Sequence, residues 1–250
     1  MNETEATLLK DGERLDDLQR NGLRIIQREQ GFRFGTDAVL LADFAKAKPG
    51  ERVCDMGTGT GVLPLLIAAR SENTTFDAFE LQPDVADMAA RSVRINGLQA
   101  RIRVHEADCR EAAKRIGYGV CHMVVTNPPY TAAGAGLVSP ENTRALSRSD
   151  SDCPLDEWMA ACAKVLKNGG RLCCVFPAPR LLQLCDAMRG AGVEPKRLRM
   201  IAARADAAPK LVLLEGLKGG KPGLHMLPLL ITHTPQGDFT DEMKRIYGDA

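Results

Sequence analysis

Strand-like and helix-like segments alternate along most of this chain, and this alternation restricts the folds that it can adopt. Strands are predicted at residues 53–56, 75–81, 102–106, 123–126 and 171–176. Helices are predicted at residues 62–70, 84–96, 155–166 and 179–189. Alternation of this kind produces a mostly parallel sheet with helices on both faces. In the last third, the apolar runs at 211–214 and 224–234 lack a long intervening helix, so we expect an antiparallel hairpin at the sheet edge.

A glycine-rich turn follows the first predicted strand. Asp55 ends that strand, and Gly57, Gly59 and Gly61 lead into the helix that starts at Val62. Glycine adopts positive φ angles and lets the backbone approach a ligand closely. The spacing is G-x-G-x-G, which differs from the G-x-G-x-x-G of dinucleotide-binding proteins. A tight strand–helix turn without a ligand would show the same pattern, so the motif needs support from other residues.

Acidic residues follow the next two predicted strands. Glu80 lies 25 positions after Asp55, where a carboxylate can accept hydrogen bonds from both hydroxyls of a ribose. Asp108 follows the strand at 102–106, where it can accept from the exocyclic amine of an adenine. Three consecutive strand ends therefore carry groups that suit an adenosine-containing ligand.

The tetrapeptide Asn127-Pro128-Pro129-Tyr130 follows the fourth predicted strand. Two successive prolines fix two φ angles at about −65° and remove two backbone donors. The Asn127 side-chain oxygen and the Pro128 carbonyl remain as a rigid pair of acceptors beside the Tyr130 ring. This set suits a planar group that carries an NH2. A proline-rich turn with a buried tyrosine is the alternative interpretation.

The order of these motifs resembles that of the class I S-adenosylmethionine-dependent methyltransferases, and Asn-Pro-Pro-Tyr resembles the motif of their amino-methylating members. Both ends of the chain resemble the bacterial adenine-N6 methyltransferases that act on valine tRNA. The segments that carry this second resemblance are residues 23–27 and 31–42, residues 214–224, and Ile246 with Tyr247.

The resemblance implies a Rossmann-like class I methyltransferase fold with a mostly parallel seven-stranded sheet and S-adenosyl-L-methionine as cofactor. The residues that it places against the cofactor are Asp55, Gly57, Gly59, Gly61, Glu80 and Asp108, with Thr36 and Asp37 closing over the methionine part. Asp37 has a second interpretation, as the N-cap of a helix over residues 38–44.

The implied reaction is methyl transfer to the N6 amine of an adenine in tRNA, in the anticodon loop of valine tRNA. Asn127 and Pro128 would accept hydrogen bonds from the amine and stabilise the positive charge that develops on it. Tyr130 would stack on the base. His105 and His122 are expected to be packing or sheet-face residues, and Trp158 is expected to pack within its helix.

The substrate is expected to contact the loop after the tetrapeptide and a basic segment at residues 196–221. That segment carries seven basic and two acidic residues, a local charge of +5 on a chain of net charge +1. Such a patch suits RNA, although a solvated edge strand protected by lysines would have the same composition. The residues expected to contact tRNA are Pro129, Arg148, Arg197, Arg199, Lys210, Lys218 and Lys221.

Length and composition agree with a single-domain cytoplasmic enzyme. The 250 residues are expected to divide into a covering segment at 1–50, a cofactor-binding core at 51–190 and C-terminal strands with the basic patch at 191–250. No apolar run reaches the roughly 18 residues of a membrane span, and the acid-rich start is unlike a secretory signal. Eight cysteines without C-x-x-C spacing, and only four histidines, predict buried free thiols and no metal site. No pattern indicates the subunit number.

Three other functions fit part of this sequence. A protein glutamine-N5 methyltransferase acting on a release factor also uses Asn-Pro-Pro-Tyr, but about 50 residues before the glycine turn are too few for its usual helical domain. A DNA adenine methyltransferase would need room for a target-recognition domain. A catalytically inactive RNA-binding module is the non-enzyme alternative, against which the intact Asn127, Tyr130 and Glu80 argue.

Overall fold

The computed structural model of the chain describes residues 8–30, 35–128 and 153–248. Within these residues a nine-stranded sheet forms the centre, in the order β10-β8-β9-β7-β6-β3-β4-β5, with β11 also paired to β8. Its strands are β3 (Arg52–Met56), β4 (Thr75–Glu80), β5 (Ile102–Glu106), β6 (Cys121–Thr126), β7 (Leu166–Pro177), β8 (Val193–Ala202), β9 (Leu211–Lys218), β10 (His225–Met226) and β11 (Leu230–Ile231). Seven of these are long, which matches the seven-stranded sheet expected from the family resemblance.

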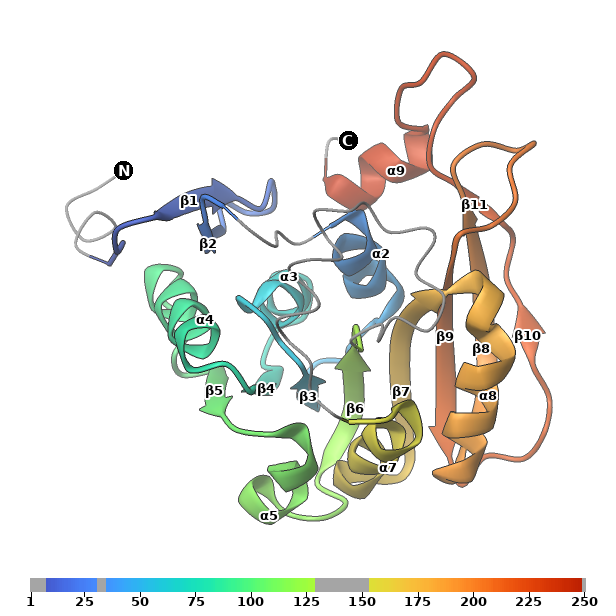
Figure 1. Cartoon of the computed structure of the whole chain (residues 1–250), viewed down its shortest axis with the longest axis horizontal. Coiled ribbons are helices and arrows are strands. Elements are labelled where there is room, and N and C mark those ends of the chain that lie inside the picture. The colour runs from blue at the N-terminus through green and yellow to red at the C-terminus, as the bar shows by residue number, and fades with distance from the viewer. Residues whose placement is uncertain (1–7, 31–34, 129–152, 249–250) are drawn as a thin grey trace.

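Helices cover both faces of the sheet (Figure 1). On one side lie α2 (Thr36–Phe44), α3 (Val62–Ala68) and α4 (Pro83–Ile95), and on the other lie α5 (Ala112–Ile116), α7 (Leu155–Val165) and α8 (Leu181–Gly190). Alternate residues of a strand point to opposite faces, so Val53 and Val125 pack in the α2–α3 layer whereas Cys54 and Val124 pack in the α7–α8 layer. The predicted α/β architecture is therefore confirmed.

An antiparallel hairpin is present, but the prediction that residues 211–214 pair with residues 224–234 was wrong. Residues 211–214 belong to β9, which runs antiparallel between β7 and β8 and does not pair with residues 224–234. Those later residues form only β10 and β11, which run parallel to β8. The reason is burial: Val212, Leu213 and Leu214 are buried on both faces of the strand, and such a strand is stabilised in the interior of a sheet.

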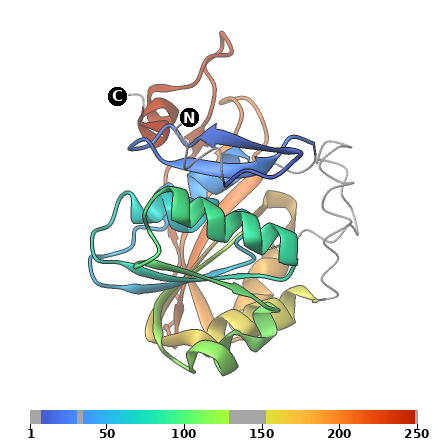
Figure 2. The ribbon, with the colours of Figure 1, turned by 90° about the vertical axis from the view of Figure 1, so that its left-hand side faces the viewer.

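An N-terminal hairpin packs along α4 (Figure 2). It consists of β1 (Glu13–Asp17) and β2 (Arg24–Arg28), paired antiparallel. The backbone N–H of Ile26 donates to the Ser92 hydroxyl at 2.9 Å, and Arg91 of α4 pairs with Glu13 at 2.6 Å. These contacts hold the hairpin against the helix that follows β4.

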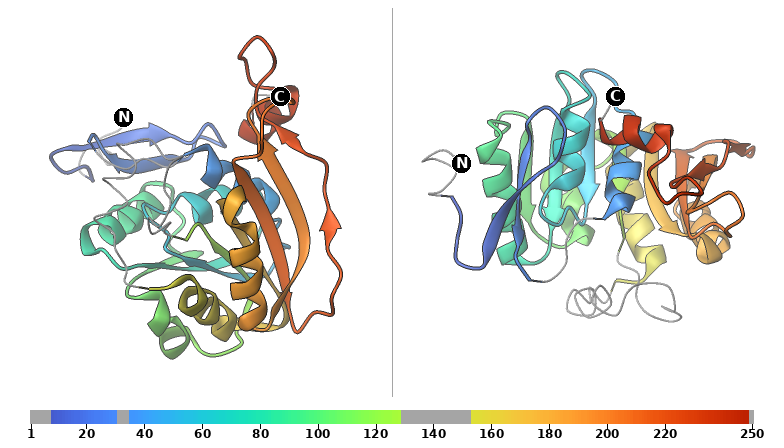
Figure 3. Two further views of the ribbon diagram at one scale, coloured as in Figure 1. Left: turned by 45° about the vertical axis from the view of Figure 1, so that its right-hand side comes forward. Right: turned by 90° about the horizontal axis from the view of Figure 1, so that it is seen from above.

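The C-terminal helix α9 (Asp241–Tyr247) lies beside α2, as the view from above in Figure 3 shows. The Arg20 and Arg70 side chains both donate to the carbonyl of Ile246, at 2.6 and 2.7 Å. The Tyr247 hydroxyl reaches the hydroxyl of Thr36, the first residue of α2, at 3.1 Å. The turn of the N-terminal hairpin is thereby tied to α9, and α9 to the start of α2.

Replacement by alanine of two glycines near α8 should change the free energy of unfolding in opposite directions. A Cβ at Gly216 of β9 would lie 2.7 Å from Val193 Cγ1 and 3.1 Å from the Glu194 carbonyl, so Gly216→Ala should lower the free energy of unfolding by about 1–3 kcal/mol. A Cβ at Gly190, the last residue of α8, meets nothing within 4 Å, so Gly190→Ala should raise it by about 0.4–1 kcal/mol. Urea denaturation of both variants measures the difference, and a change of the same sign in both would contradict the described packing.

Candidate active site

The register of the central strands brings the predicted site residues to one edge of the sheet. Met56 lies opposite Phe79 of β4 and Thr126 of β6. Gly57 follows β3, Glu80 is the last residue of β4, and Asn127 follows β6. These three residues therefore share the carboxyl edge of the sheet. Ligands of open α/β sheets bind at this edge.

The glycine-rich turn has the conformation that its composition predicts. Gly57, Gly59 and Gly61 all have positive φ angles, of 75°, 57° and 93°. A Cβ at Gly57 would lie 3.1 Å from the ring of Trp158. A Cβ at Gly59 would meet nothing within 4 Å, so that side of the turn has room for a ligand.

Glu80 ties this turn to the next helix. One carboxylate oxygen accepts from the backbone N–H of Gly59 at 3.0 Å, and the other accepts from Gln82 at 3.0 Å, directly before α4. Burial raises the pKa of Glu80, and these backbone hydrogen bonds oppose the rise. Each carboxylate oxygen has a second acceptor site, so the group retains the capacity to accept from the hydroxyls of a ribose.

Asp55 is buried without a hydrogen-bond partner. Its exposure is 0%, and neither carboxylate oxygen has a partner of hydrogen-bonding geometry among the described residues. Burial raises the pKa of Asp55 to about 7; the nearby Thr58 hydroxyl opposes the rise and the charge of Glu80 adds to it. A buried carboxylate in this state is suited to a positively charged ligand. The residues present therefore fit a cationic, adenosine-containing cofactor such as S-adenosyl-L-methionine.

Asp108 lies at the predicted place, but its carboxylate already has a partner. It is the N-cap of a short 3-10 helix at Cys109–Glu111 and accepts from the Arg110 backbone N–H at 2.8 Å. The Arg110 guanidinium also donates to it, at 2.6 Å from Nη2. These hydrogen bonds lower the pKa of Asp108 despite partial burial. An adenine amine would share the carboxylate with Arg110 or displace it.

The end of β6 is braced by a residue whose role the sequence did not reveal. The Thr126 hydroxyl donates to the Met56 carbonyl at 2.7 Å and accepts from the Trp158 indole N–H at 3.0 Å. Trp158 also lies against Gly57. It was expected to pack within its own helix, and instead it connects the glycine turn to the residue before Asn127. An indole buried this deeply needs a hydrogen-bond acceptor, which is the physical reason for the link.

Asn127 contacts the start of α2. Its side-chain Nδ2 donates to Asp37 Oδ2 at 2.8 Å, and the following Pro128 is buried. The N-cap of α2 is Gly35, so the interpretation of Asp37 as the N-cap was wrong: Asp37 lies in the first turn. Three expected substrate residues, Pro129, Tyr130 and Arg148, lie outside the described residues, as does part of the segment at 31–42.

The basic segment is not gathered at this edge. Arg197 pairs with Glu215 at 3.0 Å, and Arg199 pairs with Glu242 at 2.7 Å. Lys218 donates to the carbonyls of Ala163 and Leu166, both at 2.7 Å.

The strand register separates the lysines. Leu211 lies opposite Pro177 at the carboxyl end of β7, whereas Leu217 lies opposite Arg171 near its amino end. Lys210 is therefore at the carboxyl edge of the sheet, two strands from β6, and Lys218, with Lys221 beyond it, is toward the opposite edge.

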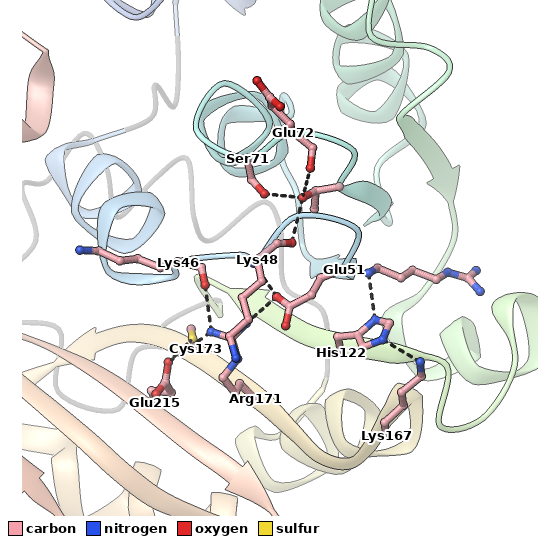
Figure 4. Close-up of polar contacts among 12 residues, drawn as sticks. Lys46, Lys48, Glu51, Ser71, Glu72, His122, Lys167, Arg171, Cys173 and Glu215 are labelled. Atoms are coloured by element: carbon pink, nitrogen blue, oxygen red, sulfur yellow. Dashed lines mark hydrogen bonds and ion pairs between the residues drawn. The ribbon is translucent and has the colours of Figure 1, made fainter.

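Glu215, the partner of Arg197, belongs to a cluster of charged residues that extends over β7 and β9 (Figure 4). The Cys173 thiol donates to Glu215 Oε2 at 3.5 Å, and Arg171 forms an ion pair with Glu51. His122 accepts from the Arg52 backbone N–H at 3.0 Å, at the amino end of β6 and away from Asn127. His105 stacks on Phe79 with centroids 4.6 Å apart. His105 thus packs as predicted, whereas His122 is held in β6 by a hydrogen bond.

The cysteines are free thiols, seven of them buried and Cys185 half-buried, which confirms their predicted burial. Within residues 8–30, 35–128 and 153–248, no group of three or more His, Cys, Asp or Glu side chains could hold a metal ion. No helix in the described part of the chain is both long enough and apolar enough to cross a membrane.

Comparison with known sequences shows which protein family the chain matches. The model of the methyltransferase small domain family matches residues 30–189. A Parabacteroides distasonis protein named tRNA1(Val) (adenine(37)-N6)-methyltransferase is 30% identical, over 85% of this chain and 90% of its own. A protein of the same name from Erwinia tasmaniensis is also 30% identical, over 86% of each chain.

Solved structures share the fold. A predicted O-methyltransferase from Agrobacterium tumefaciens superposes with a TM-score of 0.69 at 24% identity, covering 84% of this chain and 95% of its own. P. horikoshii TYW2 in complex with MeSAdo superposes with a TM-score of 0.58 at 18% identity, over 84% of this chain and 73% of its own. At these identities the likeness concerns the fold alone.

Replacement of Asp55 by asparagine should stabilise the ligand-free protein in a pH-dependent way. The folded-state pKa of about 7 exceeds the value of about 3.9 in an unfolded chain, so the folded state holds this proton more tightly. The destabilisation by Asp55 therefore grows between about pH 4 and pH 7 and stays constant above, at up to about 4 kcal/mol. Urea unfolding at pH 5 and pH 8 should show a larger gain for Asp55→Asn at pH 8.

The exposed Asp206 provides the control, since Asp206→Asn should change stability little at either pH. A gain from Asp55→Asn that is equal at both pH values would contradict the burial argument.

The Asp55→Asn variant should also bind S-adenosyl-L-methionine more weakly than the wild type, because the asparagine carries no charge to meet the cofactor's cation. Isothermal titration calorimetry measures that loss.

Proposed function

The chain belongs to the methyltransferase small domain family, and we propose that it transfers a methyl group from S-adenosyl-L-methionine to the exocyclic N6 amine of an adenine in tRNA. The observation that carries this proposal is the position of Asn127. It follows β6 at the carboxyl edge, next to the glycine turn and the buried Asp55. At this position the Asn127 side-chain oxygen can accept a hydrogen bond from the substrate amine, while the neighbouring glycine turn holds the cofactor.

The choice of tRNA follows the relatives. Two of them, each 30% identical over most of both chains, are named tRNA1(Val) (adenine(37)-N6)-methyltransferase. We therefore infer that the acceptor is adenine 37, in the anticodon loop of a valine tRNA. A loop base costs little to extrude, because it is not held in a duplex. A tRNA substrate also supports a cytoplasmic location, in keeping with eight free thiols.

The protein's task in this reaction is to activate a poor nucleophile. S-adenosyl-L-methionine supplies a methyl group that is already activated as a sulfonium. The lone pair of the adenine amine is delocalised into the ring, so the enzyme must favour a tetrahedral nitrogen. The Asn127 oxygen and the Pro128 carbonyl would accept the two N–H groups and stabilise the positive charge that develops as the C–N bond forms and the C–S bond breaks. The surplus proton then leaves to water, without a charged general base.

Other residues have supporting roles in this proposal. The cofactor is held by Asp55, the three glycines, Glu80 and Asp108, and Thr36 closes over its methionine part. Tyr130 stacks on the base, a contact worth about 1–3 kcal/mol, with Pro129 beside it.

Arg148, Arg197, Arg199, Lys210, Lys218 and Lys221 are the proposed tRNA contacts. We place Lys210 first among them, because it is exposed at the carboxyl edge of the sheet while Arg197, Arg199 and Lys218 already use donors within the protein.

Replacement of Asn127 by alanine should abolish methyl transfer and leave cofactor affinity largely intact. The variant loses an acceptor for the amine but none of the groups assigned to the cofactor. Mass spectrometry of nucleosides from unmodified tRNA, incubated with the protein and S-adenosyl-L-methionine, should show N6-methyladenosine with the wild type only.

Asn168→Ala is the matched control, because Asn168 is exposed at the amino end of β7 and should not affect the product. If the wild type modifies no tRNA nucleoside, the proposed substrate is wrong. If Asn127→Ala also loses cofactor binding, the division of roles between Asn127 and the glycine turn is wrong.

A further inference from the structure

We propose that Asp37 is a positioning residue for catalysis, which holds the Asn127 amide in the one orientation that can accept from the substrate amine. This inference rests on the proposed function and assigns Asp37 a role that differs from covering the cofactor. It concerns one contact between two segments 90 positions apart.

The contact itself defines the orientation of the amide. Asn127 Nδ2 donates to Asp37 Oδ2 at 2.8 Å. A carboxylate can only accept hydrogen bonds, whereas an amide has a donor branch and an acceptor branch. Asp37 therefore selects the donor branch, and Asn127 Oδ1 points along the other branch from Cγ. A rotation of the amide by 180° would set its oxygen against the carboxylate and present its NH2 to the NH2 of adenine, which leaves the Pro128 carbonyl as the one acceptor of the proposed pair.

The Asp37 side chain is itself held in place. Its second oxygen, Oδ1, accepts from the Ala38 backbone N–H at 2.9 Å. A Cβ at Gly35 would lie 2.7 Å from this same oxygen, so the glycine leaves the space that the carboxylate occupies. A carboxylate in the first turn of a helix is also favoured by the helix dipole.

Rigid elements support both partners of the contact. Asp37 is on α2, whose Leu40 and Leu41 are buried in the core. On the other side, Thr126 is fixed by its hydrogen bonds to Met56 and Trp158. A polar group that must meet a transition state is most effective when its supporting residues hold it in advance. Asp37 provides that support for Asn127.

The first experiment separates positioning from cofactor binding. Asp37→Ala should reduce the single-turnover rate of methyl transfer to tRNA by about 10- to 100-fold, while the Kd for S-adenosyl-L-methionine changes by no more than about threefold, as expected for a group that acts only on the transition state. Asp43→Ala is the matched control: Asp43 is on the same helix, pairs with Arg70 at 3.0 Å, and should leave the rate unchanged. A cofactor Kd that rises by the same factor as the rate falls would make Asp37 a cofactor ligand and overturn the proposal.

A charge exchange gives a readout that a purely structural role would not produce. Asn127→Asp alone places two carboxylates against each other and should be nearly inactive. In the double variant Asp37→Asn, Asn127→Asp, the new asparagine can donate to the new carboxylate, whose second oxygen still accepts from the amine. We expect the double variant to exceed the single Asn127→Asp variant in rate by about tenfold or more. Equal rates for the two would overturn the proposal.

The wild-type rate distinguishes this inference from the proposed function. If the wild type does not methylate tRNA, the proposed function fails and the catalytic role of Asp37 fails with it. If the wild type is active and Asp37→Ala is equally active, only the inference fails. NMR of protein labelled with 15N-asparagine follows the contact directly: the Asn127 side-chain signals, assigned by their loss in Asn127→Ala, should shift in Asp37→Ala and stay in place in Asp43→Ala. Unshifted signals in Asp37→Ala would also overturn the inference.

Discussion

The parallel register of β4, β3 and β6 is the constraint on which the active site depends. Because these strands end level, Gly57, Glu80 and Asn127 share one edge although 70 positions separate the first from the last. A slip of one residue would turn each side chain to the opposite face of the sheet. Trp158 adds a cross-brace, since it lies against Gly57 and donates to Thr126. The glycine turn and the end of β6 are therefore positioned together.

Binding chemistry at this edge conflicts with the stability of the ligand-free fold. Asp55 is fully buried and its oxygens have no hydrogen-bond partner among the described residues, and the like charge of Glu80 is close enough to raise its pKa further. A buried carboxylate of this kind costs folding free energy, and a cationic ligand bound there would offset that cost. Local rules of stability are commonly broken at functional sites and satisfied elsewhere in the protein. Here the well-packed layers on both faces of the sheet provide the compensating stability.

The start of α2 connects the end of β6 to the C-terminal helix. Asp37 contacts Asn127, and Thr36 contacts Tyr247. Residues 36–37 and 246–247 belong to the segments whose sequence resembles the tRNA-specific subfamily more than the general methyltransferase fold. In the proposed function, the central strands hold the cofactor, which many methyltransferases share, and Asp37 lies beside the side chain that meets the acceptor, which differs between them.

Local sequence patterns were sufficient to predict β3 to β7, the helices α3, α4, α7 and α8, and a glycine turn with positive φ angles, because each depends on neighbouring residues. They missed β8, whose Lys196, Arg197 and Arg199 interrupt the apolar pattern, and they gave residues 211–214 the wrong partner, since burial on both faces decides which strands pair. The sequence by itself determined which polar groups stand at the strand ends. Only the tertiary structure decided that Asp37 holds Asn127 and that Trp158 holds Thr126, because side-chain hydrogen bonds form between neighbours in space, here 90 and 32 positions apart in the chain.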